Sequence, residues 1–263
     1  MIKKILKQIL RDGKDYLLHL KYKNGLPRNP MHDDIYLVAY PKSGVTWLQH
    51  IIGNIELNLA DKDEIITFYN HHKYSPDIYQ IKYIKVNRFL DRTFIKSHEE
   101  FNPYYYFVVY LIRNPYDAMV SYYNFLLNYE YKLTFEEFVK SSNGITAWKK
   151  HVSSWLYKNA SAQRIHIIKY EDLIKNSENE IRKLYKNFGL EISNDILNKA
   201  LLNSSLNSMS GSENHYKENN PKHTLYFVGE KNKINKNELL TNEIVDYINF
   251  VVKDEINDFY PEL

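Results

Sequence analysis

The sequence predicts an α/β fold: a single domain with a central parallel sheet flanked by helices and a P-loop-like nucleotide site. Apolar stretches of strand length alternate with helical patterns, which is typical of a parallel sheet covered on both faces. The 263 residues suit one large domain, and no internal repeat or low-complexity linker divides 1–263. A glycine-containing turn, Tyr40 to Gly44, joins the first expected strand to a helix.

The individual elements follow from apolar periodicity and from capping signals. The expected strands cover 35–40, 93–97, 107–112 and 164–169. The expected helices cover 2–10, 45–59, 116–128, 134–141, 145–159, 177–189, 193–203 and 241–258. Thr134 with Glu137, and Ser177 with Glu180, have the spacing of capping boxes and are expected to open two of these helices.

Composition excludes several classes of protein. The chain has no cysteine, which excludes disulfides, thiolate metal sites and cysteine nucleophiles. A net charge of +3 is too small to indicate nucleic acid. No apolar run is long enough for a transmembrane helix, so we expect no stable membrane insertion and a cytoplasmic location. The basic amphipathic segment at 2–10 has two readings, packing on its own domain or lying on an anionic membrane surface.

Polar side chains follow four of the expected strands. Lys42, Lys96 with His98, Arg113 and Tyr170 each lie just past the end of a different strand. In parallel α/β sheets ligands bind beyond the carboxyl ends of the strands. These residues are therefore expected to form one site.

The turn Tyr40-Pro41-Lys42-Ser43-Gly44-Val45-Thr46-Trp47 has the features of a phosphate loop. A strand, a tight turn and a helix N-terminus together present backbone N–H groups to an anion. The lysine precedes the glycine, whereas a Walker loop ends in Gly-Lys-Ser/Thr. We therefore expect a phosphate site that differs from that of an ordinary ATPase.

A second anion site is expected after the strand at 107–112. Arg113-Asn114-Pro115 forms a turn, and Ser121 follows two helical turns later. The planar fork of arginine donates two parallel hydrogen bonds and so matches a terminal phosphate. The serine hydroxyl can face the same anion.

These motifs, with Lys96-Ser97-His98 and Tyr170-Glu171-Asp172-Leu173, resemble those of the sulfotransferases that use PAPS (3′-phosphoadenosine 5′-phosphosulfate). They occur in the family's order and cover most of residues 35–173. The resemblance implies PAPS as co-substrate, adenosine 3′,5′-bisphosphate as product and no required metal. It places Arg113 and Ser121 at the 3′-phosphate, Tyr170 at the adenine side and Lys96 at the acceptor site.

The chemistry expected of the site is in-line sulfuryl transfer to a hydroxyl or amine of a small molecule. His98 is the candidate general base, because its unperturbed pKa lies near working pH. Lys42, with the N–H groups of Ser43, Gly44, Val45 and Thr46, would stabilise charge on the leaving oxygen. Lys96 would assist there, and the resemblance implies that Ser121 restrains Lys42 until an acceptor arrives. The expected nucleotide contacts are Lys42, Ser43, Gly44, Val45, Thr46, Trp47, Arg113, Ser121, Tyr170, Ser204, Leu206, Gly229 and Lys231.

The match to the family is weaker toward the C-terminus. Ser204 and Leu206 lie in a segment similar to one that packs on adenine, with leucine in place of a phenylalanine. Only Gly229 remains of the family's last glycine-tryptophan loop, with Lys231 as a candidate charge. Residues 211–236 have few apolar side chains and are expected to be poorly ordered without ligand.

Two other functions stay open at this point. A P-loop kinase would require Gly-Lys-Ser/Thr and a Walker B aspartate, and the sequence has neither. An inactive nucleotide-binding sensor or scaffold would not need Lys42, Lys96, His98, Arg113 and Ser121 together. The chemical identity of the acceptor cannot be inferred from the segments that would line its pocket. These segments, 61–92, 124–145 and 210–225, are rich in Tyr, Phe and His. The acidic pair Glu99-Glu100 is either a Mg²⁺ ligand set or a solvated surface pair, and the oligomeric state is open.

Overall fold

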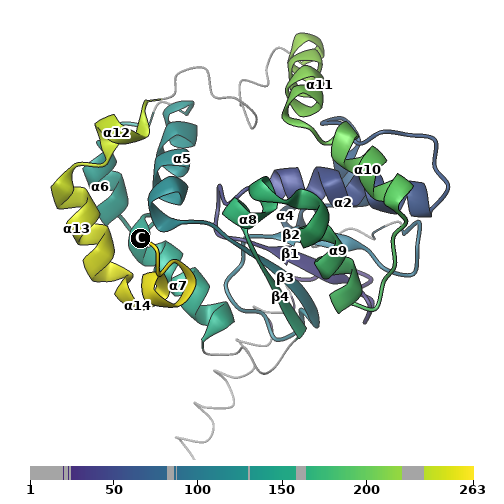
Figure 1. The fold of residues 1–263 in the computed structure, drawn as a ribbon, viewed down its shortest axis with the longest axis horizontal. Helices are drawn as coiled ribbons and strands as arrows, with labels where there is room; N and C mark the ends of the chain where they lie inside the picture. The colour runs from purple at the N-terminus through teal and green to yellow at the C-terminus, as the bar shows by residue number, and fades with distance from the viewer. Residues whose placement is uncertain are drawn as a thin grey trace, which may run out of the picture.

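A four-stranded parallel sheet lies at the centre of the molecule, with the strand order β2-β1-β3-β4 (Figure 1). The strands are β1 (Ile35–Val38), β2 (Phe94–Ser97), β3 (Phe107–Ile112) and β4 (Arg164–Lys169). The computed structural model describes residues 20, 23, 25–81, 86, 88–129, 131–157, 164–220 and 234–263. The expected parallel sheet is confirmed, and each expected strand is present.

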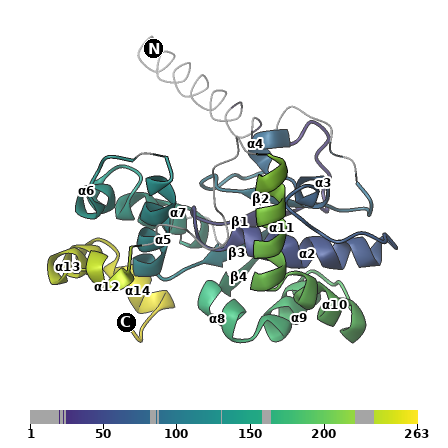
Figure 2. The same ribbon diagram turned by 90° about the horizontal axis from the view of Figure 1, so that it is seen from above.

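Helices cover both faces of the sheet (Figures 1 and 2). One face is covered by α2 (Val45–Leu59), α8 (Tyr170–Lys175), α9 (Ser177–Asn187) and α10 (Asn194–Asn203). The other is covered by α5 (Pro115–Leu127), α6 (Phe135–Lys140), α7 (Ile145–Leu156), α13 (Asn242–Val251) and α14 (Lys253–Phe259). The remaining helices are α3 (His71–Tyr74), α4 (Ile78–Ile81), α11 (Leu206–Asn219) and α12 (Lys236–Leu239).

The alternation of side chains along β1 explains why the molecule has two apolar cores, one on each face of the sheet. Ile35 and Leu37 pack with α2, whereas Tyr36 and Val38 pack on the opposite face with the helices that follow β3. Side chains of a strand point alternately to the two faces of its sheet, so a strand covered on both faces is apolar throughout. All four residues of β1 are buried, as this requires.

Helix capping confirms one of the two expected capping boxes and corrects the other. Asn114 caps α5, accepting from the amide of Tyr116 at 2.9 Å, and Pro115 occupies the first turn. The capping box of Thr134 and Glu137 is confirmed. The second expected box is wrong: Asn176 caps α9, while the Ser177 hydroxyl donates to the carbonyl of Leu173. The cap is supplied by the residue before Ser177: the side-chain oxygen of Asn176 accepts from the amide of Asn179 at 3.2 Å.

The C-terminal third differs most from expectation. The helix expected at 241–258 is two helices, separated at Val252. Residues 211–219, expected to be poorly ordered, belong to α11. The Ser205 hydroxyl caps this helix, and Phe68 and Tyr69 bind its side, Tyr69 Oη donating to the carbonyl of His215 at 3.0 Å. Tertiary contacts therefore stabilise a helix that its polar sequence does not indicate. The helix expected at 2–10 lies outside the described residues.

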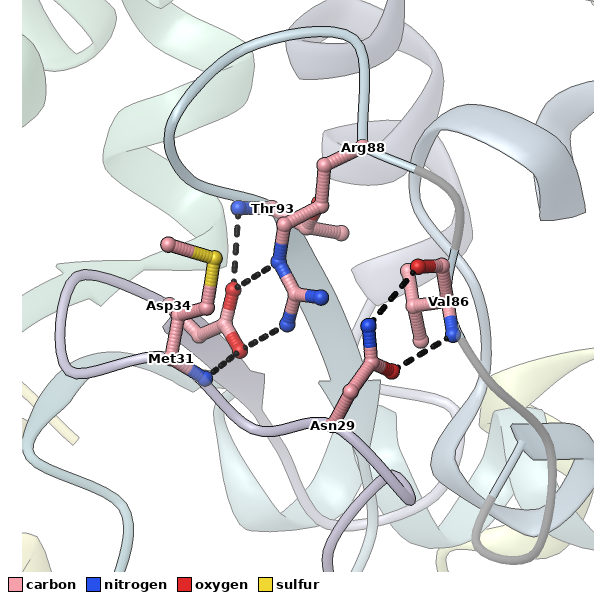
Figure 3. A network of polar contacts seen from close by, with 6 residues as sticks. All are labelled: Asn29, Met31, Asp34, Val86, Arg88 and Thr93. Carbon is pink, nitrogen blue, oxygen red and sulfur yellow. Dashed lines mark hydrogen bonds and ion pairs between the residues drawn. The ribbon is translucent and has the colours of Figure 1, made fainter.

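A buried ion pair joins the beginnings of β1 and β2 (Figure 3). The Asp34 carboxylate accepts two hydrogen bonds from Arg88, at 3.1 and 2.5 Å, and others from the amides of Met31 and Thr93. Asp34 is completely buried, so its charge depends on these donors. The network fixes the end of the sheet opposite to the strand ends that carry the candidate site residues.

Candidate active site

The loop between β1 and α2 has the backbone of an anion site. Lys42 and Gly44 both have positive φ, 65° and 93°. The amide of Ser43 donates to the carbonyl of Tyr40 at 3.3 Å, so it closes the turn and does not belong to the expected set of anion donors. The amides of Gly44, Val45 and Thr46 lie at the N-terminus of α2, where first-turn N–H groups have no intrahelical partner.

Gly44 has little room because Tyr170 packs against it. A Cβ atom at Gly44 would lie 2.4 Å from two ring carbons of Tyr170. Tyr170 is the first residue of α8, directly after β4, and its ring also contacts the edge of Trp47. The glycine is thus required both by its backbone angle and by the close approach of a ring from another strand.

Arg113 connects the two expected phosphate sites. Its guanidinium lies over the Tyr170 ring, 4.4 Å from the centroid, and its Nη1 donates to the carbonyl of Lys42 at 2.9 Å. Its Nε is buried and has no hydrogen-bond partner among the described residues. The Ser43 hydroxyl in the loop is likewise buried and without a partner in the described chain. Buried donors without partners are rare, and an anion at this position would satisfy them.

The Lys42 side chain lies against α5. Its Nζ is 4.4 Å from the centroid of the Phe125 ring, a cation–π contact. Ser121 lies in α5, one helical turn before Phe125, and is half-buried. The Lys42 side chain therefore contacts the helix that carries Ser121. The sequence did not assign Phe125, because an aromatic residue in an amphipathic helix normally indicates core packing.

Glu171 is a further residue that the sequence left without a role. Its carboxylate accepts from the amide of Asn114 at 2.9 Å and from the hydroxyl of Tyr260 at 3.1 Å. It therefore joins the turn after β3, the start of α8 and the C-terminal segment. These bonds hold Arg113 and Tyr170 at a fixed separation.

The segment expected at the adenine is partly internal. Ser204 is completely buried: its hydroxyl accepts from Asn54 at 3.0 Å, and its carbonyl accepts from Trp47 Nε1 at 2.9 Å. Its hydroxyl is therefore used inside the protein, and the residue acts on the site by orienting Trp47. Leu206 begins α11 with 71% of its surface exposed. Gly229 and Lys231 lie outside the described residues.

The acceptor side of the site contains His98 just past β2. Its Nδ1 is 2.6 Å from the carbonyl of Ala39, so this nitrogen donates and the Nε2 lone pair is available. Burial first, and then the positive charges of Lys96 and Lys42, lower the pKa of His98 to about 4, while the Ala39 carbonyl and Asp77 oppose this shift. The histidine is therefore neutral at pH 7, but its pKa does not lie near working pH, which was the reason for expecting a general base here.

Lys96 has an acidic partner. Its Nζ lies 3.1 Å from Oδ2 of Asp77, in an ion pair that is mostly buried. Glu99 is the residue after His98. Its neighbour Glu100 forms an ion pair at the surface, where its Oε1 lies 2.7 Å from Lys150 Nζ. In the part of the chain that the structure describes, no group of three or more His, Cys, Asp or Glu side chains is arranged for a metal ion.

Comparison with known proteins places the chain in a family. The family model described as sulfotransferase domain matches residues 32–260. Bovine sulfotransferase 1E1 is 27% identical over 195 residues, which are 67% of this chain and 66% of that protein. Human sulfotransferase 1C2 is 26% identical over 204 residues, with the same coverage. The chain thus spans about two thirds of the length of these curated relatives.

Solved structures show the same fold. Retinol dehydratase in complex with retinol and PAP has a TM-score of 0.67 at 16% identity, covering 91% of this chain and 86% of that one. Mouse sulfotransferase SULT7A1 complexed with PAP has a TM-score of 0.60 at 20% identity, covering 88% and 86%. No described helix has the length and apolar character needed to cross a bilayer.

Proposed function

The chain belongs to the sulfotransferase domain family, and from that premise we propose that it transfers a sulfuryl group from PAPS to a hydroxyl or amine of a small molecule. The observation that carries the proposal is the environment of Arg113. This side chain holds the carbonyl of Lys42, stacks on Tyr170 and keeps a buried N–H group without a partner among the described residues. A group of that kind is suited to one end of a nucleotide that has an anionic group at each end.

The residues present fit PAPS at both of its anionic ends. Arg113 and Ser121 would hold the 3′-phosphate, and Lys42, Ser43 and the first-turn amides of α2 would hold the 5′ end. The Ser43 hydroxyl and Arg113 Nε would gain the acceptors that they lack within the described chain. Trp47, oriented by Ser204, and the exposed Leu206 would face the adenine.

The protein's own contribution to the reaction is proton removal and charge stabilisation. PAPS supplies the sulfuryl group when bound. His98, with Nδ1 held by the Ala39 carbonyl, would take the proton of the acceptor at Nε2. Lys42 would move from the Phe125 ring to the charge on the departing phosphate oxygen, and Lys96 would act at the same transferred group.

The acceptor class is a small organic molecule. Retinol dehydratase, similar in fold, has been solved with retinol in one case and androsterone in another. His50, Phe68 and His71 form a ring cluster near the start of α2, and Tyr40, Tyr122 and Phe138 form another near α5. His71 and Tyr122 are the partly exposed rings of the two clusters and are the candidates for contact with the apolar or aromatic body of an acceptor.

The nucleotide assignment is tested by calorimetric titration with adenosine 3′,5′-bisphosphate and with adenosine 5′-phosphate. Arg113→Ala should weaken binding of the bisphosphate by about 1.5–3 kcal/mol more than binding of the monophosphate, since only the former has the 3′ anion. Arg182→Ala is the matched control, because that arginine pairs with Glu178 at the surface of α9. Equal losses for both nucleotides would place Arg113 elsewhere.

Turnover separates the proposed enzyme from a nucleotide-binding scaffold. The protein is incubated with PAPS and a panel of phenols, alcohols, sterols and amines, and release of adenosine 3′,5′-bisphosphate is followed. Acceptor-dependent release supports the proposal. Tight nucleotide binding with no turnover over the whole panel would favour the scaffold.

A further inference from the structure

Asp77 is an acidic residue that the sequence did not connect with the site. It lies directly before α4, nineteen positions before Lys96 in the sequence, in a segment with no motif of its own. The structure places it beside that strand, where Asp77 and Lys96 form an isolated parallel bridge.

Both oxygens of the Asp77 carboxylate have a partner. Oδ1 accepts from the amide of Tyr79 at 3.0 Å, which fixes the side chain at the start of α4. Oδ2 lies 3.1 Å from Lys96 Nζ. The two side chains are only 19% and 15% exposed, so water screens their attraction weakly.

The backbone around Asp77 is held from two sides. The amide of Lys96 donates to the carbonyl of Pro76 at 2.8 Å. The side chain of Gln49, buried in α2, donates to the carbonyl of Ser75 at 2.7 Å. Because α2 begins at the phosphate loop, the loop helix and the strand that leads to His98 both position this carboxylate.

Lys96 lies in β2 and His98 directly follows the strand, and the positive charge of Lys96 acts on the His98 imidazole. The charged and titratable groups around His98 are Lys96 on its own strand, Asp77 before α4, Lys42 in the loop and His151 in α7. Asp77 is the negative group among these. It therefore opposes the two lysines at the imidazole.

Resting on the function proposed above, we infer that Asp77 is a positioning residue: it fixes the Lys96 ammonium and balances its charge, so that His98 can accept the acceptor's proton. Without the carboxylate, Lys96 would be free to move, and His98 would face two lysines with no opposing charge. Imidazolium would become less stable, and the histidine a weaker base.

The test compares Asp77→Asn, Lys96→Met and the double variant. Asparagine keeps the oxygen that accepts from Tyr79 and removes only the charge. We expect Asp77→Asn to lower kcat roughly tenfold, as a misplaced group near the reacting atoms does, with little change in KM for PAPS. The double variant should lose little more than Lys96→Met alone, because Asp77 acts through that lysine.

The decisive readout is the titration of the His98 ring by NMR with adenosine 3′,5′-bisphosphate bound. Asp77→Asn should shift its pKa downward and Lys96→Met upward, since the two side chains carry opposite charges. The acid limb of the pH profile of kcat/KM should move in the same two directions. A residue with only a structural role would change thermal stability and leave both titrations in place.

Glu136→Gln is the control, because it removes one charge of an exposed ion pair on α6, remote from β2. If Asp77→Asn leaves the His98 pKa and kcat at their wild-type values in a folded protein, the inference is overturned. If wild-type protein shows no sulfuryl transfer at all, the proposed function fails, while the NMR titration still decides whether Asp77 acts on His98.

Discussion

At the scale of single residues, the site depends on side chains that are held by neighbouring elements, and Arg113 is held from two directions. His98 is fixed through Nδ1 by a carbonyl of the neighbouring strand end, Ala39. Arg113 is fixed by the Lys42 carbonyl and the Tyr170 ring. Such double anchoring lowers the conformational freedom that binding would otherwise remove, and it makes single substitutions informative.

His98→Ala should lower kcat by roughly 10²- to 10⁴-fold, the range measured for positioned acid–base groups. Affinity for adenosine 3′,5′-bisphosphate should stay near that of the wild type, because the proposed role of the ring is toward the acceptor's proton and not toward the nucleotide. Steady-state kinetics and calorimetry measure the two effects. His72→Ala, at an exposed position of α3, is the control, and retained turnover in His98→Ala would remove this histidine from the mechanism.

Gly44→Ala should weaken nucleotide binding at least tenfold. The added Cβ would meet the Tyr170 ring at 2.4 Å, and a positive φ costs a residue with a side chain about 1–2 kcal/mol. Gly211→Ala is the matched control: it lies in α11 with nothing within 4 Å of the added atom, and helix propensity predicts a gain in stability. Unchanged affinity in Gly44→Ala would mean that the loop tolerates a shift of Tyr170.

At the scale of elements, polar contacts near the ends of strands and helices add to the apolar packing between them. Asp34 with Arg88 ties the starts of β1 and β2, and Glu171 ties the turn after β3 to α8. Lys236 of α12 pairs with Asp117 in the first turn of α5 at 2.6 Å. A carboxylate in the first turn stabilises a helix N-terminus, so Asp117 both stabilises α5 and anchors a second helix.

Asp34→Ala should lower the free energy of unfolding by about 3–5 kcal/mol, because it leaves the Arg88 charge buried without its partner. Urea denaturation followed by circular dichroism measures the loss. Glu136→Ala breaks an ion pair whose side chains are 47% and 56% exposed, and it should cost less than about 1 kcal/mol. Similar losses in the two variants would show that the Asp34 network contributes no more than a surface pair.

At the scale of the whole molecule, buried histidines link stability to pH. Burial lowers the pKa of His50, His71 and His98 to about 4 and that of His151 to about 3. In the unfolded chain a histidine titrates near 6.5. Between about pH 6.5 and 4 the unfolded chain therefore binds protons that the native protein does not, and stability falls as the pH falls.

Each of these histidines should contribute up to about 1.4 kcal/mol per pH unit to the slope of the unfolding free energy in that window. Urea titrations at several pH values measure the slope. His151→Gln should reduce it by the contribution of one proton. Tyr110→Phe, which removes the 2.7 Å bond to His151 and keeps the imidazole, should lower stability without reducing the slope. An unaltered slope in His151→Gln would show that His151 takes no part.

Much of the fold could be predicted because local sequence patterns indicate its strands and helices. β1 and β3 are continuous apolar runs, α2 has the bounds its periodicity indicates, and Thr134 with Glu137 forms the expected capping box. The parallel connection then requires that the carboxyl ends of the strands meet at one edge. Lys42, His98, Arg113 and Tyr170 could therefore be assigned to one region before any coordinates were known.

The contacts that complete the site were decided by tertiary structure. Asp77 reaches Lys96, Tyr170 covers Gly44, and Phe68 and Tyr69 hold α11, all across loops or elements that separate the partners in sequence. A helix or strand has a period that a short window reveals, whereas a contact between distant segments has none. The sequence by itself thus determined the strands and the polar residues at their ends. Packing determined which partners hold those residues in place.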